Sequence, residues 1–198
     1  MRDLFRIWKD VMFDPVAFYK SLPKYSFRKS NEFYLKVSAV MILAMVIFMA
    51  IFIGIILFIV ASSGTGIEGV SDDMFPLIWL GILVGLFVLS PILLLLQWGY
   101  LYVGAAIMHL FVLLFGGKKG YKETVTTVAY SSAPAPLSLI PLVGYAAGVY
   151  SIVLVIMGLR ERQKMSTGQS VAAVLIPVFV YMFFIGLVYF IWIFSTLY

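Results

Sequence analysis

The chain contains no cysteine and a single histidine, His109, and its long apolar runs carry almost no charge. The absence of cysteine excludes disulfide bonds, thiolate metal ligands and a cysteine nucleophile. One histidine without neighbouring carboxylates forms neither a metal site nor a Ser-His-carboxylate triad. We therefore expect a protein that is not an enzyme and that binds no metal or cofactor.

Hydrophobic residues, in contrast, are abundant. They form 63% of the 198 residues, charged residues form only 12%, and the mean hydropathy is +1.07. A soluble domain of this length does not have such a composition. In lipid, a spanning segment of this kind is helical, because backbone amides find no partner there except other backbone groups. The sequence therefore predicts an all-α, polytopic membrane helix bundle.

Basic residues concentrate before the first long apolar run. Residues 1–36 contain eight of the fourteen lysines and arginines. Apolar residues recur among them at helical spacing, which predicts an amphipathic interfacial segment ahead of a membrane domain over residues 37–198. Asp14 as an N-cap and Pro15 at the first helical position predict a short second helix that ends before Pro23. The segment either binds anionic lipid or serves only as a positively charged anchor.

The longest uncharged stretch decides how the rest of the chain is arranged. Phe75 to Phe115 contains no lysine, arginine, aspartate or glutamate, and His109 is its one histidine. A helical crossing of ~30 Å takes about 20 residues, so this stretch is too long for one plain span and too short for three. The loops at its two ends determine how often it crosses.

These two loops differ in charge. Residues 62–75 include three carboxylates and no basic residue, whereas residues 116–122 include three lysines. Basic loops remain on the cytoplasmic side, so the first loop is expected outside and the second inside. The stretch between them then crosses once. We predict a long span broken near Pro91, where proline removes a helical hydrogen bond.

The same argument gives the remaining spans. Residues 160–164 hold three basic residues and mark a second inside loop, so the chain between the two inside loops crosses twice. Three prolines between residues 134 and 141 place the turn at the outer end. The amino terminus is expected in the cytoplasm and the carboxyl terminus outside, at the cell membrane if the source is prokaryotic. The five expected spans are residues 37–61, 75–115, 124–139, 141–159 and 171–197.

Polar residues within the spans are rare, and each has two interpretations. His109 and Gln97 either hydrogen-bond to neighbouring helices or contribute to a proton or solute path. Glu123 is expected to pair with a nearby lysine, with a proton-binding carboxylate as the alternative. The glycines at 116, 117 and 120 follow no strand, which favours a tight turn with lysines facing lipid phosphates over a nucleotide site. The candidate functional or packing positions are Gln97, His109, Gly116, Gly117, Lys118, Lys119, Gly120, Tyr121, Glu123, Tyr130, Pro134 and Pro141.

Several short motifs carry a resemblance through their order and spacing. They are Asp14-Pro15-x-x-Phe18, His109-Leu110, Gly116-Gly117-x-x-Gly120-Tyr121-x-Glu123-Thr124, Ala129-Tyr130-x-x-x-Pro134, Pro141-x-x-Gly144, Gly158-Leu159-Arg160-Glu161, Thr167-Gly168-x-x-x-Ala172 and Ile176-Pro177. Together they resemble the Yip-domain family, the five-span Ypt/Rab-interacting membrane proteins, in its prokaryotic form.

The resemblance implies membrane organisation or an adaptor role rather than catalysis. Eukaryotic members are associated with vesicle traffic and prenylated small GTPases, but this chain lacks the Asp-Leu-Tyr-Gly-Pro signature of those members. The expected partners are membrane lipids, with anionic headgroups near the N-terminal segment and Lys118 and Lys119, and a protein or a second copy of the chain, but not nucleic acid. The alternative is a transporter or channel for a small neutral or lipid-like solute.

Overall fold

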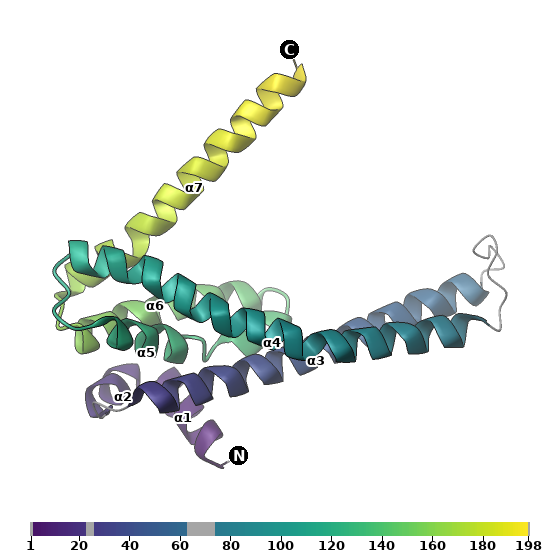
Figure 1. Ribbon diagram of the computed structural model, residues 1–198, viewed down its shortest axis with the longest axis horizontal. Helices are drawn as coiled ribbons and strands as arrows, with labels where there is room; N and C mark the ends of the chain where they lie inside the picture. Colours follow the sequence, from purple (N-terminus) through teal and green to yellow (C-terminus); the bar gives the residue numbers. More distant parts are fainter. Residues whose placement is uncertain (1, 23–25, 63–73, 198) are drawn as a thin grey trace.

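The computed structural model describes residues 2–22, 26–62 and 74–197, and no strand occurs within these ranges. The carboxylates of the expected outer loop, Glu68, Asp72 and Asp73, lie outside the described residues. Seven α-helices and one short 3₁₀ helix follow one another along the described chain (Figure 1). They are α1 (Arg2–Phe13), α2 (Pro15–Ser21), α3 (Ser26–Ser62), α4 (Phe75–Leu114), α5 (Tyr121–Ser131), η2 (Ala135–Leu139), α6 (Val143–Arg162) and α7 (Thr167–Leu197).

A long helical hairpin and a separate arm dominate the molecule. Helices α3 and α4 pack side by side, and their outer halves project from the bundle, while α1, α2, α5, η2 and α6 gather around the inner half of this hairpin (Figure 1). Helix α7 begins against α4 and α6 and then leaves the bundle. Of the described helices, four are long and apolar enough to cross a membrane, namely α3, α4, α6 and α7.

Helix α4 differs from its predicted form. Its 40 residues continue through Pro91 without interruption, so the prediction of a break there is wrong. At 1.5 Å per residue the helix is about 60 Å long, roughly twice the thickness of the hydrocarbon layer. Proline removes one backbone bond, but the hydroxyl of Ser90 donates to the carbonyl of Leu86 at 2.8 Å, which gives this turn an additional hydrogen bond.

The third expected span is also not a single helix. Helix α5 has 11 residues, about 16 Å, and is followed by a turn and the five-residue η2. Prolines at the turn lack the N–H groups that would continue an α-helix, so the chain tightens into the 3₁₀ form. The expected count of five spans is therefore not reproduced. The segment between the two basic loops nevertheless starts and ends at the same end of the bundle, because the amide of Lys118 donates to the carbonyl of Gln163 at 3.1 Å.

The N-terminal segment folds as two helices that dock on the bundle. Asp14 caps α2 by accepting from the amide of Ala17 at 3.3 Å, with Pro15 at the first helical position, as predicted. The indole of Trp8 donates to the carbonyl of Ala133 at 2.8 Å. The division of the chain at residue 36 stays a prediction, although α3 runs through that position and α1 and α2 share one hydrophobic core with α3, α5 and α6.

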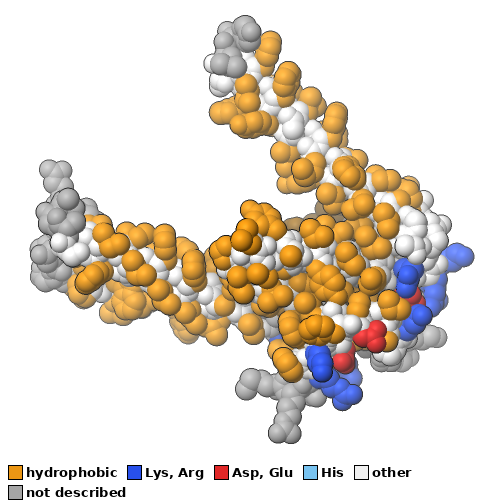
Figure 2. All heavy atoms as spheres, turned by 180° about the vertical axis from the view of Figure 1, so that it is seen from behind, with side chains coloured by type: hydrophobic (Ala, Val, Ile, Leu, Met, Phe, Trp, Pro, Cys, Tyr) orange, Lys and Arg blue, Asp and Glu red, His pale blue; other side chains and the backbone are white. Residues whose placement is uncertain are grey.

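Charge is distributed unevenly over the molecule. On the face shown in Figure 2, charged side chains gather at one end of the bundle, and hydrophobic side chains cover the two arms. We call this end the basic end, defined by the end of α2, the loop of residues 115–120 and the connection from α6 to α7. It contains the two loops that charge bias assigns to the cytoplasmic side.

Candidate functional site

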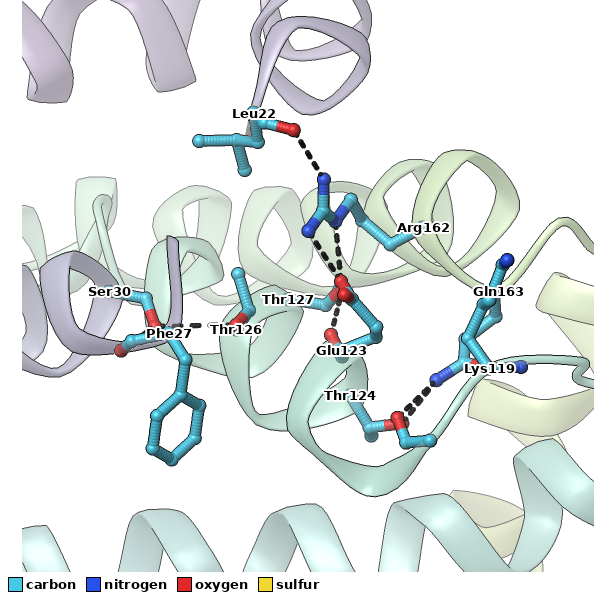
Figure 3. Close-up of polar contacts among 11 residues, drawn as sticks. Leu22, Phe27, Ser30, Lys119, Glu123, Thr124, Thr126, Thr127, Arg162 and Gln163 are labelled. Atoms are coloured by element: carbon cyan, nitrogen blue, oxygen red, sulfur yellow. Dashed lines mark hydrogen bonds and ion pairs between the residues drawn. The ribbon is translucent and has the colours of Figure 1, made fainter. Parts of the chain in front are cut away.

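An arginine connects three helices at the basic end. Arg162, at the end of α6, donates from Nε to Glu123 Oε2 at 2.7 Å and from Nη1 to the carbonyl of Leu22 at 2.8 Å (Figure 3). The Arg162 side chain is 10% exposed and that of Glu123 is 23% exposed, so solvent screens the pair only in part. Glu123 thus pairs with Arg162 rather than with Lys119 or Lys122, because a guanidinium can bond a carboxylate and a carbonyl at once.

Gln163 closes the loop between α4 and α5. Its side chain is fully buried, and Oε1 accepts from the amide of Lys119 at 2.8 Å. Its Nε2 donates to Thr124 Oγ1 at 2.9 Å and to the carbonyl of Gly120 at 3.3 Å (Figure 3). A single side chain therefore satisfies polar groups of the loop and of the first turn of α5, and it ties them to the end of α6.

His109 reaches the same network from α4. Its Nδ1 lies 2.8 Å from Thr124 Oγ1, and its ring centroid lies 5.7 Å from that of Tyr121. Because Thr124 Oγ1 already accepts from Gln163, its hydroxyl hydrogen is available for Nδ1. This arrangement fits a neutral imidazole whose proton is on Nε2. It corresponds to the structural interpretation of His109, a hydrogen bond to a neighbouring helix.

The glycine pair after α4 is a helix cap. Gly116 has φ +87°, its amide donates to the carbonyl of Leu113, and the amide of Gly117 donates to the carbonyl of Val112 at 2.7 Å. These two bonds form a Schellman motif, in which a left-handed residue terminates the helix. A Cβ on Gly117 would lie 2.3 Å from Val112 Cγ1, which explains the second glycine. Since the loop amides from 116 to 119 all donate within the protein, they do not form a phosphate cradle.

The other candidate positions are spread over the bundle. The hydroxyl of Tyr121 donates to the carbonyl of Tyr102 at 2.6 Å, close to His109. Tyr130 is buried further along α5, and Gln97 lies roughly 18 Å from His109 along α4. Pro134 precedes η2, and Pro141 is exposed in the turn before α6. The basic end thus brings together residues 109, 116–121 and 123, but not the remaining four candidates.

The sequence did not indicate three of the residues that organise the basic end. Arg162 and Gln163 lie in a short charged stretch whose pattern indicates only the cytoplasmic side. Tyr19 is 1% exposed, and its hydroxyl donates to the carbonyl of Thr127 at 3.3 Å. Burial raises the pKa of Tyr19 above its ordinary value, so the hydroxyl stays protonated and keeps this bond. One residue in the sequence does point to this packed contact, namely Gly158 on α6. A Cβ at Gly158 would lie 2.5 Å from Thr127 Cγ2 and 2.9 Å from Tyr19 Cζ, so only glycine fits there.

Long apolar helices joined at one basic end define an integral, multi-pass membrane protein. A comparison with models of protein families identifies the family within this class. The model of the Yip1 domain matches residues 9–190, nearly the whole chain, and the protein belongs to the Yip1-domain family. A search of curated proteins and a search of solved structures each found no match.

Proposed function

We propose that this protein is a non-enzymatic organiser of the membrane, and that its basic end is a rigid cytoplasmic platform for lipid or protein partners. The observation that carries the proposal is a difference between two groups of polar side chains at the basic end. Those that could take part in chemistry, such as Glu123, His109 and Gln163, are bonded to one another or to the backbone. The lysines around them are exposed to their surroundings, and they are Lys20, Lys118, Lys119, Lys122 and Lys164.

Exposed lysines at a membrane surface favour anionic partners. Each basic residue near an anionic leaflet contributes about 1 kcal/mol of attraction. The platform itself is held rigid by contacts that join distant parts of the chain, for example the bond from Arg162 to the carbonyl of Leu22. A rigid array of charges fits recognition of a surface better than the binding and release of a small solute.

One observation supports the alternative of a transporter or channel. Gln97 Oε1 is buried in the bundle without a hydrogen-bond partner among the described residues. A solute path needs several such groups in sequence, and His109 is already bonded to Thr124. The transport function therefore stays the second candidate.

The proposal is tested by isolating the protein from native membranes in mild detergent and identifying retained proteins and lipids by mass spectrometry. We expect a defined partner that survives washing with wild-type protein and is lost from the variant K118Q/K119Q/K122Q. Phe183→Leu, on the apolar arm, serves as the control and should retain the partner. Equal recovery of the same partners from wild type and the lysine variant would refute a platform at the basic end.

The orientation of the platform can be measured separately. Because the chain has no cysteine, a single introduced cysteine gives a clean signal. We expect Lys118→Cys to be protected from an impermeant thiol reagent in intact cells and Ser195→Cys to be labelled. Labelling of Lys118→Cys would place the basic end outside and overturn the proposed orientation.

A further inference from the structure

Two cavities with different linings meet at Leu4, between α1 and α3. One has a volume of about 310 Å³ and the other of about 390 Å³, each at the lower end of the ~300–1,000 Å³ range of ligand sites. Leu4 is part of the wall of both. The first is lined also by Arg6, Ile7, Lys29, Glu32, Phe33 and Lys36, and the second by Phe5, Trp8, Val37, Val40 and Pro136.

The first cavity has an excess of positive charge. Its one carboxylate, Glu32, is bonded to Arg28 at 3.1 Å. The three basic side chains of the lining, Arg6, Lys29 and Lys36, form no ion pair with any side chain that the structure describes. Lys29 and Lys36 are seven residues apart on one face of α3. The cavity therefore suits a compact anion.

The second cavity is apolar, and one side of it is held in place. The indole of Trp8 is fixed by its bond to the carbonyl of Ala133, and the ring of Phe5 stacks on it at a centroid distance of 5.9 Å. Val40 is one helical turn beyond Lys36, on the same face of α3. The side chain of Phe5 nevertheless is 66% exposed, which leaves an apolar surface beside the groove.

The charged and the apolar cavity follow each other along α3 in the same order as the headgroup layer and the hydrocarbon of a membrane. Helix α3 starts beside α2, at the basic end, and its outer half forms the arm of the hairpin with α4 (Figure 1). On α3, residues 29, 32, 33 and 36 line the charged cavity, and residues 37 and 40 line the apolar one. The charged cavity thus lies nearer the headgroup layer, and the apolar cavity lies deeper, toward the hydrocarbon.

We infer that the groove between α1 and α3 binds one anionic glycerophospholipid. The phosphate lies among Arg6, Lys29 and Lys36, and one acyl chain passes Leu4 into the apolar cavity beside Val40. The unpaired basic side chains of the first cavity fit an anion, and the apolar lining of the second fits a hydrocarbon chain. The inference goes beyond the proposed platform, because it concerns a separate site away from the lysines of residues 118–122.

The first experiment tests the headgroup and uses the full chain in mild detergent. Native mass spectrometry and thermal unfolding are recorded with added phosphatidylglycerol, phosphatidylcholine or glycerol 3-phosphate. We expect one retained phosphatidylglycerol and a raised Tm with that lipid alone. K29Q/K36Q should weaken retention at least tenfold, whereas K9Q, at an exposed lysine of α1 that lines neither cavity, should leave retention unchanged.

The second experiment tests the acyl chain with a matched pair of tryptophan variants. Val40→Trp fills the apolar cavity and should reduce retention as strongly as K29Q/K36Q. Leu43→Trp places the same bulk on α3 at a residue that is 61% exposed and does not line the cavity, and should bind as wild type does.

Three results would overturn the inference. Equal stabilisation by glycerol 3-phosphate would reduce the site to an anion site, and equal stabilisation by phosphatidylcholine would remove the role of charge. Loss of lipid from K118Q/K119Q/K122Q but not from K29Q/K36Q would refute the groove and leave the proposed platform intact. Loss of the platform's partner with normal lipid retention would refute the platform instead.

Discussion

The basic end and the apolar arms of this protein are built on different principles. At the basic end, polar side chains from α4, α5 and α6 bond to one another, and Gln163 is fully buried among them. In the arm formed by the outer part of α7, large apolar side chains face outward, with Phe183 68% and Phe190 65% exposed. An apolar surface of this extent is typical of a helix that faces lipid or another protein in the membrane.

The two arms also differ in how they are held. Helices α3 and α4 make contact along the hairpin, where Trp79 Nε1 donates to the carbonyl of Ala50 at 3.2 Å, and the indole lies against Gly54. In lipid, apolar burial provides no drive for helix association, so close packing and hydrogen bonds decide it. We expect the network at the basic end to contribute more to the arrangement of the helices than the outer part of the hairpin does. Four substitutions, in decreasing order of expected effect, test this comparison.

Arg162→Met should have the largest effect. It leaves the partly buried carboxylate of Glu123 without its partner and the carbonyl of Leu22 without a donor, which should destabilise the fold by about 3 kcal/mol. The measurement is the free energy of unfolding in mixed detergent micelles. Lys118→Met, at an exposed side chain of the same end, is the control. If both variants unfold alike, the ion pair does not hold the basic end together.

Gly158→Ala tests the packing of α2, α5 and α6. The added Cβ would lie 2.5 Å from Thr127 Cγ2 and 2.9 Å from Tyr19 Cζ, and such overpacking should destabilise by about 1–3 kcal/mol. Gly148→Ala is the matched control on the same helix, because nothing lies within 4 Å of its added Cβ. This control should be neutral or stabilised by up to about 1 kcal/mol through helix propensity. A tolerant Gly158 would show that the junction is loosely packed.

Trp79→Phe probes the arm of α3 and α4. It removes the bond to the carbonyl of Ala50 while it keeps an aromatic ring, and a hydrogen bond between membrane helices averages about 0.6 kcal/mol. Unfolding measured as above should show a loss of this size. A loss as large as that of Arg162→Met would mean that the arm contributes as much specificity as the basic end.

Phe183→Leu should have the smallest effect. The side chain is 68% exposed on α7, and one lipid-facing apolar residue replaces another, so the change should stay within about 0.5 kcal/mol. A marked loss of stability, or a change in oligomeric state by size-exclusion chromatography with light scattering, would instead identify this face of α7 as a protein contact.

The sequence by itself determined the features that depend on residues close together in the chain, such as helix length, helix capping and the charge of each loop. Composition over windows of about 20 residues predicted the long helices, and Asp14-Pro15 predicted the cap of α2. Charge bias predicted only that the loops around Lys118 and Gln163 lie on the same side of the membrane, and the structure places the two loops in contact. These signals are local because hydropathy, capping and proline geometry depend on residues a few positions apart.

Only the tertiary structure decided which distant residues meet. It paired Glu123 with Arg162, although nearer lysines were available, and it buried Gln163, which no local pattern distinguishes from a surface residue. It kept α4 helical through Pro91 and ended α5 at Ser131. The physical reason is that a buried polar group takes whichever partner chain packing places within reach, and in this bundle those partners lie up to 140 residues away.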